Sequence, residues 1–320
     1  MIWNRNRFIR SEEQKAAART EKAKRDAAKA AEAASTMPPS ETYLQTVLRR
    51  FRHHKLAMIS FVILGIIVFA AAFAPLLAPY EPTAISSSFS AAPSAEHWLG
   101  TDQVGRDVFS RLLYATRVSL LVGVAAAGLS TLIGVVLGLL SGYFGGIVDM
   151  LVMRVTDMVM SFPYILLVLV AAAVFEPGLW TIVCILAFVD WPGVARLVRG
   201  NVLSLRETNF VKSNLVAGMP KAHILFSEIL PNTLAPVLVY ATSVTALSIL
   251  DEAALSFLGM GIRPPQASLG NMLDGAQSLT VLTGKLWLWM PPGIMLILIV
   301  VAINFIGDAL RDAMDPTSTD

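Results

Sequence analysis

The chain has few of the residues on which disulfides and metal sites depend. It has a single cysteine, Cys184, which lies inside an apolar segment. No disulfide can therefore form within the chain, and cysteine usage does not identify the compartment. The four histidines, at positions 53, 54, 97 and 223, do not cluster with other ligand types. We expect no metal site.

The motifs that mark nucleotide binding and hydrolysis are also missing. There is no G-x-x-x-x-G-K-[ST] sequence, because Gly284-Lys285 is followed by Leu286 and lacks the upstream glycine. There is no H-E-x-x-H or G-x-S-x-G sequence either. A membrane enzyme using Asp190 or Asp251 would lack a second placed catalytic group. We therefore expect neither catalysis nor a bound cofactor.

Charged residues are scarce and apolar residues abundant. Only 15% of the 320 residues are charged, 55% are hydrophobic, and the mean hydropathy is +0.63. A soluble domain cannot bury that much apolar surface, so the sequence predicts an all-α integral membrane protein. The net charge of +2 says little, because the charges are unevenly placed.

Six apolar stretches have about the 20 residues that a membrane-spanning helix requires. These predicted spans are 56–78, 118–141, 155–175, 179–199, 233–255 and 287–307.

Basic residues predict the orientation of these spans. They gather before the first span (Arg49, Arg50, Arg52, Lys55) and in the loop after the fourth (Arg206, Lys212, Lys221). The short turn after the third span, at 176–178, is acidic. Because cytoplasmic loops carry the excess of Lys and Arg, the amino terminus and the fourth-to-fifth loop are predicted to be cytoplasmic. An even number of spans returns the carboxyl terminus to the same side.

The sequence divides into three parts. Residues 1–55 are predicted to be a charged cytoplasmic tail, because 11–34 has almost nothing apolar to bury. Its first residues, with Trp3 and Phe8 among arginines, could instead contact anionic lipid. The first apolar run starts too late for a cleaved signal peptide. Residues 56–98 are expected to form the first span and an outer loop, and 99–316 the main transmembrane domain.

The second and third spans carry small and helix-breaking residues. Glycines recur every four residues at 134, 138, 142 and 146, a spacing that lets another helix approach closely. Arg154 and Asp157 open the third span three residues apart, close enough to pair on one helix face. Pro163 is predicted to bend the helix above them.

Three carboxylates fall within apolar stretches, namely Asp190, Asp251 and Glu252. Ionisable groups at bilayer depth are expensive and typically functional, so all three are pore or gating candidates. Near the ends of spans, carboxylates are often simply solvated, and that alternative stays open.

Residues 200–232 form a polar loop between two apolar spans. Ser204 and Glu207 have the spacing of a capping box, which predicts a helix start. Leu205, Val211, Leu215 and Val216 recur at helical spacing. Gly218 suits the left-handed end of that helix, and Pro220 can begin a second short helix. We predict a helix-turn-helix at a membrane surface, which suggests a docking element.

Residues 99–120 lie in the predicted outer region. Asp107 is predicted to cap a helix whose Val108, Leu112, Ala115 and Val118 form one apolar face. Arg106, Arg111 and Arg117 are then expected to remain available to water or headgroups. The segment is either an outer-face platform or an interfacial helix without a ligand role.

Several motifs together resemble the binding-protein-dependent ABC importer permeases, and most closely the second permease subunit of the dipeptide/oligopeptide/nickel importers (DppC/OppC type). The matching residues are Trp191-Pro192-Gly193, Ala195 to Arg199, Glu207, Phe210-Val211, Gly218 and Ile229 to Asn232, with 99–120, 256–265, 270–273 and 307–316. The resemblance covers roughly residues 45–316.

The resemblance implies a MetI-like fold of six transmembrane helices with both termini in the cytoplasm. It also makes 200–232 the coupling loop that docks on an ATPase subunit. The matching coupling residues are Glu207, Phe210, Val211, Ser213, Asn214, Gly218, Leu230 and Pro231. The family has alanines where this chain has Ser213 and Asn214; Ser213 keeps a small side chain and Asn214 does not.

The function implied is that of a permease subunit of an ATP-driven peptide importer. It would form half of the pore in the bacterial cytoplasmic (inner) membrane, in contact with lipid and without nucleic acid. A homologous second permease, two ATPase subunits that bind ATP and Mg, and an extracytoplasmic peptide-binding protein would be its partners. The same permease type also carries nickel chelates and other small solutes.

A stand-alone secondary carrier is the alternative from another class. It would require an inverted internal repeat, broken helices and a coupling carboxylate at the membrane midplane. No clear repeat is present, and 320 residues is short for a monomeric carrier. Uptake by this chain alone, driven by an ion gradient, would favour that alternative.

Overall fold

The computed structural model describes Arg25 and residues 43–314. The chain divides into two compact units, Met1–Thr46 and Val47–Asp320. Apart from Arg25, the predictions for residues 1–42 lie outside the described residues. The account that follows concerns the second unit.

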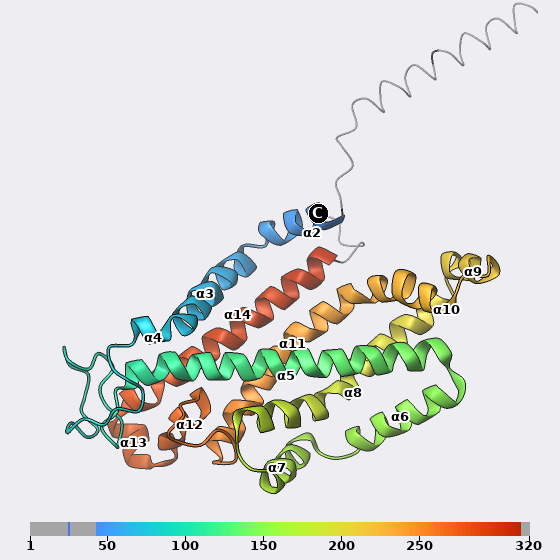
Figure 1. The fold of residues 1–320 in the computed structure, drawn as a ribbon. Helices are drawn as coiled ribbons and strands as arrows, with labels where there is room; N and C mark the ends of the chain where they lie inside the picture. The colour runs from blue at the N-terminus through green and yellow to red at the C-terminus, as the bar shows by residue number, and fades with distance from the viewer. Residues whose placement is uncertain (1–24, 26–42, 315–320) are drawn as a thin grey trace, which may run out of the picture. The chain divides into compact units, whose positions relative to one another are not determined.

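The described residues form helices and no strand, which confirms the all-α prediction; one isolated antiparallel bridge joins Thr101 and Asp107. The longer helices (Figure 1) are α2 (Tyr43–His53), α3 (Lys55–Ala72), α5 (Val108–Phe144), α6 (Gly146–Met160), α7 (Tyr164–Val174), α8 (Leu179–Arg206), α9 (Asn209–Val216), α11 (Leu230–Phe257) and α14 (Met290–Met314). The short ones are α4 (Ala74–Leu77), α10 (Lys221–His223), the π-helix η1 (Ile224–Ile229), α12 (Leu269–Leu273), the 3₁₀ helices η2 (Asp274–Gln277) and η3 (Leu286–Leu288), and α13 (Leu279–Gly284).

Five helices of the described chain are long and apolar enough to cross a membrane, namely α3, α5, α8, α14 and the continuous run from α10 to α11. A sixth crossing depends on α6 and α7, which are bent by 87° where they meet. The predicted span 155–175 falls within this bent pair, and the predicted bend at Pro163 is confirmed. Pro163 precedes the first residue of α7, and its carbonyl accepts the amides of Leu166 and Leu167.

Helix α5 is a single helix of 37 residues. Its start is the predicted one, because Asp107 accepts a 2.8 Å hydrogen bond from the Ser110 amide. The predicted capped helix and the second span are therefore one continuous helix. Val108, Leu112 and Ala115 are buried, as their spacing predicted, and this apolar face continues without a break into the span.

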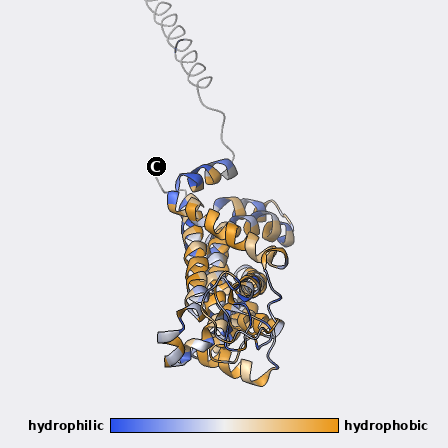
Figure 2. Cartoon of the chain, turned by 90° about the vertical axis from the view of Figure 1, so that its left-hand side faces the viewer, coloured by the Kyte–Doolittle hydropathy of each residue, from blue (hydrophilic) through white to orange (hydrophobic). Residues whose placement is uncertain are grey.

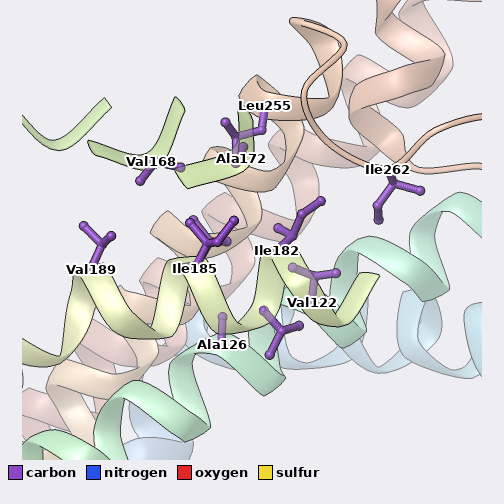
Figure 3. Close-up of a cluster of buried hydrophobic side chains, with 11 residues drawn as sticks. Val122, Ala126, Val168, Ala172, Ile182, Ile185, Val189, Leu255 and Ile262 are labelled. Atoms are coloured by element: carbon purple, nitrogen blue, oxygen red, sulfur yellow. The ribbon is translucent and has the colours of Figure 1, made fainter. Parts of the chain in front are cut away.

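Helices α5 and α8 form the central pair of the second unit. In one core cluster, Val122 and Ala126 of α5 meet Ile182 and Ile185 of α8, and α7 covers them with Val168 (Figure 3). Burying such apolar side chains against each other fixes the positions of α7 and α8 relative to α5.

The glycine ridge of α5 explains how close that pair lies. A β-carbon placed at Gly138 would lie 2.7 Å from the Ala195 carbonyl oxygen and 2.7 Å from the Val198 β-carbon. Gly134 and Gly142 face α8 in the same way. Gly146 has nothing within 4 Å and instead begins α6. The prediction of close packing is confirmed for the first three glycines only.

Large apolar side chains are exposed along the outer helices. Phe61 and Ile66 of α3, Leu132 of α5 and Ile297 of α14 are each more than half exposed. Figure 2 shows that hydrophobic residues predominate along the helices of this unit. Such a surface suits a hydrocarbon solvent, and it accords with the predicted multi-pass membrane protein.

The helices give the second unit two distinct ends (Figure 1). Helices α9 and α10 lie at one end, together with the start of α3 and the end of α14. Residues 78–107, α12 and α13 lie at the other end. The two ends therefore carry the two segments for which the sequence suggested docking roles.

Candidate functional site

The predicted docking segment 200–232 is a helical hairpin between α8 and α11. Its first boundary differs from the prediction, because Ser204 and Glu207 do not form a capping box. Ser204 donates to the Gly200 carbonyl within α8, and Glu207 follows the last residue of that helix. Helix α9 starts later, after Thr208.

The predicted turn after α9 is present. Gly218 has φ +75°, in the left-handed region where glycine is the usual residue. The amide of Met219 bonds the Asn214 carbonyl, and the amide of Gly218 bonds the Leu215 carbonyl. This pair is the Schellman pattern of hydrogen bonds that ends a helix. Pro220 precedes α10 directly, as predicted to within one residue.

One face of the hairpin is held firmly by the transmembrane helices. Val211 of α9 is buried in a cluster with Ile224 and Ile229 of η1 and Val202 of α8. The Arg206 guanidinium donates a 2.9 Å hydrogen bond to the Gly142 carbonyl at the end of α5. The hairpin is thus connected to the central α5–α8 pair.

The other face of the hairpin is apolar and uncovered in the described chain. Val216 is 89% exposed and Leu215 58%, and Phe210 and Met219 are about 40% exposed. Phe226 on η1 is also exposed. Apolar side chains gathered on a rigid, solvent-facing element are typical of an interaction surface.

The remaining predicted coupling residues lie around this apolar face. Glu207 is mostly exposed and pairs with Lys212 at 2.8 Å, and that hydrogen bond lowers the pKa of the Glu207 carboxyl. Ser213, Gly218 and Pro231 are exposed, whereas Asn214 and Leu230 are half-buried. Of the eight predicted residues, Val211 is the one that is buried.

Ion pairs join the helices beneath the hairpin. Asp149 of α6 accepts two hydrogen bonds from Arg199 of α8, at 2.5 and 2.6 Å, and a third from Ser141 of α5. Asp157 pairs with Arg196 of α8 at 2.6 Å. The predicted pair of Arg154 with Asp157 is therefore wrong, because a cation on the neighbouring helix lies closer to that carboxylate.

Two of the predicted deep carboxylates come together from different helices. Tyr164 of α7 donates a 2.7 Å hydrogen bond to Asp251 of α11. Ser248, one turn earlier on α11, donates at 3.3 Å to Asp190 of α8. Tyr164 and Asp190 both line a pocket of about 230 Å³. The arrangement forms a polar site between three helices.

Glu252 lies in a different environment. Its side chain is fully buried and accepts 2.7 Å hydrogen bonds from Ser119 of α5 and Ser256 of α11. Ser119 also accepts the Leu269 amide, and Ser256 accepts the Ile262 amide. The network therefore joins α5 and α11 to the loop that leads into α12.

Sequence reasoning missed the partners of all three carboxylates and the environment of two arginines. Tyr164 and Asp251 are 87 residues apart, so no local spacing indicates their contact. Arg106 and Arg111 were expected to face water or headgroups. Arg106 instead pairs with Asp102 at 2.7 Å, and Arg111 is only 4% exposed. Arg117 is exposed, as predicted.

No group of three or more His, Cys, Asp or Glu residues within the described ranges is placed to hold a metal ion.

Comparison with known proteins identifies relatives along almost the whole chain. A Brucella suis protein named provisionally as a peptide permease is 43% identical over 282 residues, which cover 88% of this chain and 93% of the relative. The dipeptide transport system permease protein DppC of Bacillus subtilis is 39% identical over 286 residues, 89% of each chain. The oligopeptide transport system permease protein OppC of the same species is 38% identical over 292 residues, 91% of this chain and 95% of the relative.

Two family profiles match separate parts of the chain. Residues 42–93 match the N-terminal transmembrane domain of oligopeptide transport permease C. Residues 134–319, more than half of the chain, match the binding-protein-dependent transport system inner membrane component. The hairpin, α8 and the last part of α5, which carries Gly134, Gly138 and Gly142, fall within the second match. The chain therefore belongs to the binding-protein-dependent transport system inner membrane component family.

Proposed function

We propose that the chain is the permease subunit of an ATP-driven importer of di- or oligopeptides. In this proposal it forms half of the translocation pore in the bacterial cytoplasmic membrane and a homologous permease forms the other half. The peptide cargo is proposed from the relatives, whose names include peptide, dipeptide and oligopeptide permeases.

The observation that supports this proposal best is the apolar face of α9. Val216 and Leu215 are exposed to solvent while Val211 on the same helix is buried against η1 and α8. Because the buried face of α9 packs against η1 and α8, a movement of α9 would also move these helices. We propose that two ATPase subunits, which bind ATP and Mg, dock on this face through 200–232.

The proposed mechanism is a population shift. Closure of the ATPase subunits on ATP binding moves the hairpin, and the hairpin moves α8 and α11, between which it lies. A ligand shifts such an equilibrium only by its different affinity for the two states. Contacts of Arg206 with Gly142 and of Arg199 with Asp149 extend that movement to α5 and α6.

The side of the membrane follows from charge. The hairpin end carries Arg206, Lys212 and Lys221, so we place it in the cytoplasm together with both termini. We count six spans by treating the bent pair α6–α7 as one. We also keep the division into a charged tail at 1–55, a first span with outer loop at 56–98 and a permease domain at 99–316.

The polar site formed by Asp190 and Asp251 remains our pore or gating proposal, together with Glu252. Asp190 lines the pocket, Asp251 accepts a hydrogen bond from Tyr164, which also lines it, and both carboxylates keep partial exposure. Glu252 does not line that pocket, and its carboxylate accepts hydrogen bonds from the hydroxyls of two serines. A gating role for Glu252 would act through the position of the loop after α11.

Val216→Asp tests the docking proposal. A carboxylate at this position would have to be buried unpaired at the ATPase interface. We expect association with the ATPase subunits to weaken by about tenfold or more, the range of a well-buried interface residue. The measurement is pull-down and affinity of the detergent-solubilised permease pair for the purified ATPase subunits.

Ser278→Asp is the control, because it adds the same charge at an exposed position at the other end of the second unit, where aspartate also suits the start of α13. It should leave the affinity unchanged. Equal affinities for wild type and Val216→Asp, or full retention after deletion of residues 205–218, would contradict ATPase docking on this hairpin.

The cargo is tested separately in proteoliposomes that hold the complete transporter. ATP-dependent uptake of labelled dipeptides and pentapeptides supports the peptide proposal and distinguishes short from longer cargo. Uptake of nickel chelates instead of peptides would leave the ABC permease proposal standing with another solute. Uptake by this chain alone, driven by an ion gradient, would favour a secondary carrier.

A further inference from the structure

A small pocket lies at the end of the second unit opposite the hairpin. It has a volume of about 160 Å³, and its lining includes Gln103, Val104, Arg111 and Pro264. Gln103, Val104 and Pro264 are exposed, so the pocket opens to the surface, whereas Arg111, which also lines it, is buried. Its walls come from α5, the 102–106 loop and the segment around α12.

Arg111 is incompletely paired for a buried cation. Its side chain is 4% exposed, and its Nη1 atom has no hydrogen-bond partner among the described residues. The Arg111 Nε atom lies 3.5 Å from Asp102 Oδ2. A buried charged donor without an acceptor is costly to leave in that state. An acceptor from outside the chain would relieve that cost.

The acidic residues of the pocket are engaged elsewhere. Asp102 accepts 2.9 Å hydrogen bonds from the Val104 and Arg106 amides and a 2.7 Å hydrogen bond from the Arg106 guanidinium. Asp274 is exposed and accepts a 2.7 Å hydrogen bond from Gln277. An additional carboxylate, from outside the chain, could therefore accept a hydrogen bond from Nη1 of Arg111.

The volume of the pocket indicates whether the carboxylate belongs to a whole peptide or to a single side chain. Pockets for small-molecule ligands usually have about 300 to 1,000 Å³, and this one is about half of the lower limit. A whole peptide does not fit, but a single side chain does. Arginine binds carboxylates in a planar, two-pronged geometry, and arginines in desolvated pockets are typical anchors of protein interfaces.

We propose that this pocket receives an acidic side chain of the extracytoplasmic binding protein, which pairs with Arg111 when that protein docks. The inference rests on the proposed function, which places this end outside the cell. The family description itself names dependence on a binding protein. Because Nη1 has no accessible surface in the free chain, the incoming carboxylate must displace a neighbouring side chain as it enters.

The test uses the complete transporter in lipid nanodiscs and the purified cognate binding protein. Arg111→Met removes the cation while keeping most of the side-chain length. We expect the Kd for the binding protein to rise at least tenfold and its dependence on salt concentration to become weaker. Arg111→Lys keeps the charge but not the two-pronged geometry and should lie between wild type and Arg111→Met.

Two further variants separate docking from misfolding. Arg263→Met removes one positive charge from an exposed arginine at the same end that does not line the pocket; it should leave the Kd unchanged. Gln103→Glu places a carboxylate on the exposed rim, where it repels an incoming acid and competes for Arg111. It should weaken binding without any change to the buried side chain.

The outcomes decide between distinct alternatives. If folded Arg111→Met and Gln103→Glu both bind the binding protein as wild type does, the inference is overturned. If Arg111→Met leaves that affinity unchanged but lowers uptake of peptides with a free carboxyl end more than of amidated ones, the occupant is the substrate, and the inference is also wrong. If the wild-type complex shows no ATP-dependent peptide uptake, the proposed function fails independently of this pocket.

Discussion

At the scale of single residues, the same amino acid has different consequences along one helix. On α5, Gly138 faces the backbone and Val198 of α8 at contact distance, whereas Gly128 has nothing within 4 Å. The four-residue spacing of the glycines predicted close helix packing. Only the position of α8 shows which of these glycines contact a neighbouring helix. Two substitutions on the same helix therefore have opposite expected effects.

Gly138→Ala should destabilise the protein, because the new methyl group must push α8 away. Overpacking a close-packed contact costs about 1–3 kcal/mol. Gly128→Ala should be neutral or stabilising, since alanine is the better helix former by about 1 kcal/mol. Thermal unfolding in detergent measures both. A melting temperature lowered equally by the two substitutions would contradict the assigned packing of α5 on α8.

Glu252 shows that a carboxylate within an apolar helix can have a purely internal set of partners. Glu252→Leu leaves the Ser119 and Ser256 hydroxyls without their acceptor, and each unsatisfied buried polar group costs about 1–3 kcal/mol. Glu252→Gln keeps one acceptor oxygen. We expect folded yield and melting temperature to fall in the order wild type, Gln, Leu. A Leu variant as stable as wild type would show that the network contributes little.

At the scale of elements, tertiary packing moves the predicted boundaries. The Ser204–Glu207 spacing predicts a helix start, yet α8 continues to Arg206 because Val198 and Val202 pack on α5 and η1 and extend the helix through the position of the expected cap. The turn at Gly218 was predictable, since few residues adopt its positive φ and glycine is the usual one.

Gly218→Val tests the importance of that turn. A β-branched side chain in the left-handed region costs roughly 1–2 kcal/mol. The end of α9 should therefore fray, and Val216 would no longer be held in position for the proposed contact with the ATPase. ATPase affinity should fall, and amide hydrogen exchange in α9 should rise. Gly218→Asn, which tolerates the same backbone conformation, is the control and should retain affinity. Unchanged exchange in the Val variant would contradict the expected strain.

At the scale of the whole molecule, the distribution of basic residues predicts that the two ends of the helical unit lie on opposite sides of the membrane, with the hairpin in the cytoplasm. Cys184 is the only cysteine, so its replacement gives a background free of thiols. In that background Ser278→Cys, between η2 and α13, should react with a membrane-impermeant maleimide in intact cells. Ser213→Cys on α9 should react only after the membrane is permeabilised.

Labelling of Ser213→Cys in intact cells would place the hairpin outside the cytoplasm. ATPase subunits could then not dock on it, and both the proposed coupling and the assignment of the Arg111 pocket to the outer side would be wrong. Both positions are exposed, so a difference in labelling reports the side of the membrane.

The sequence by itself determined the class, most of the spans, the Asp107 cap, the bend at Pro163 and the turn at Gly218. These features follow from local chemistry: runs of apolar residues, a proline without an amide hydrogen and a glycine without a β-carbon. Only the tertiary structure decided that Asp157 pairs with Arg196, that Tyr164 meets Asp251 and that Arg111 is buried. Those contacts join residues on separate segments, and their energies depend on how α5, α8 and α11 pack together.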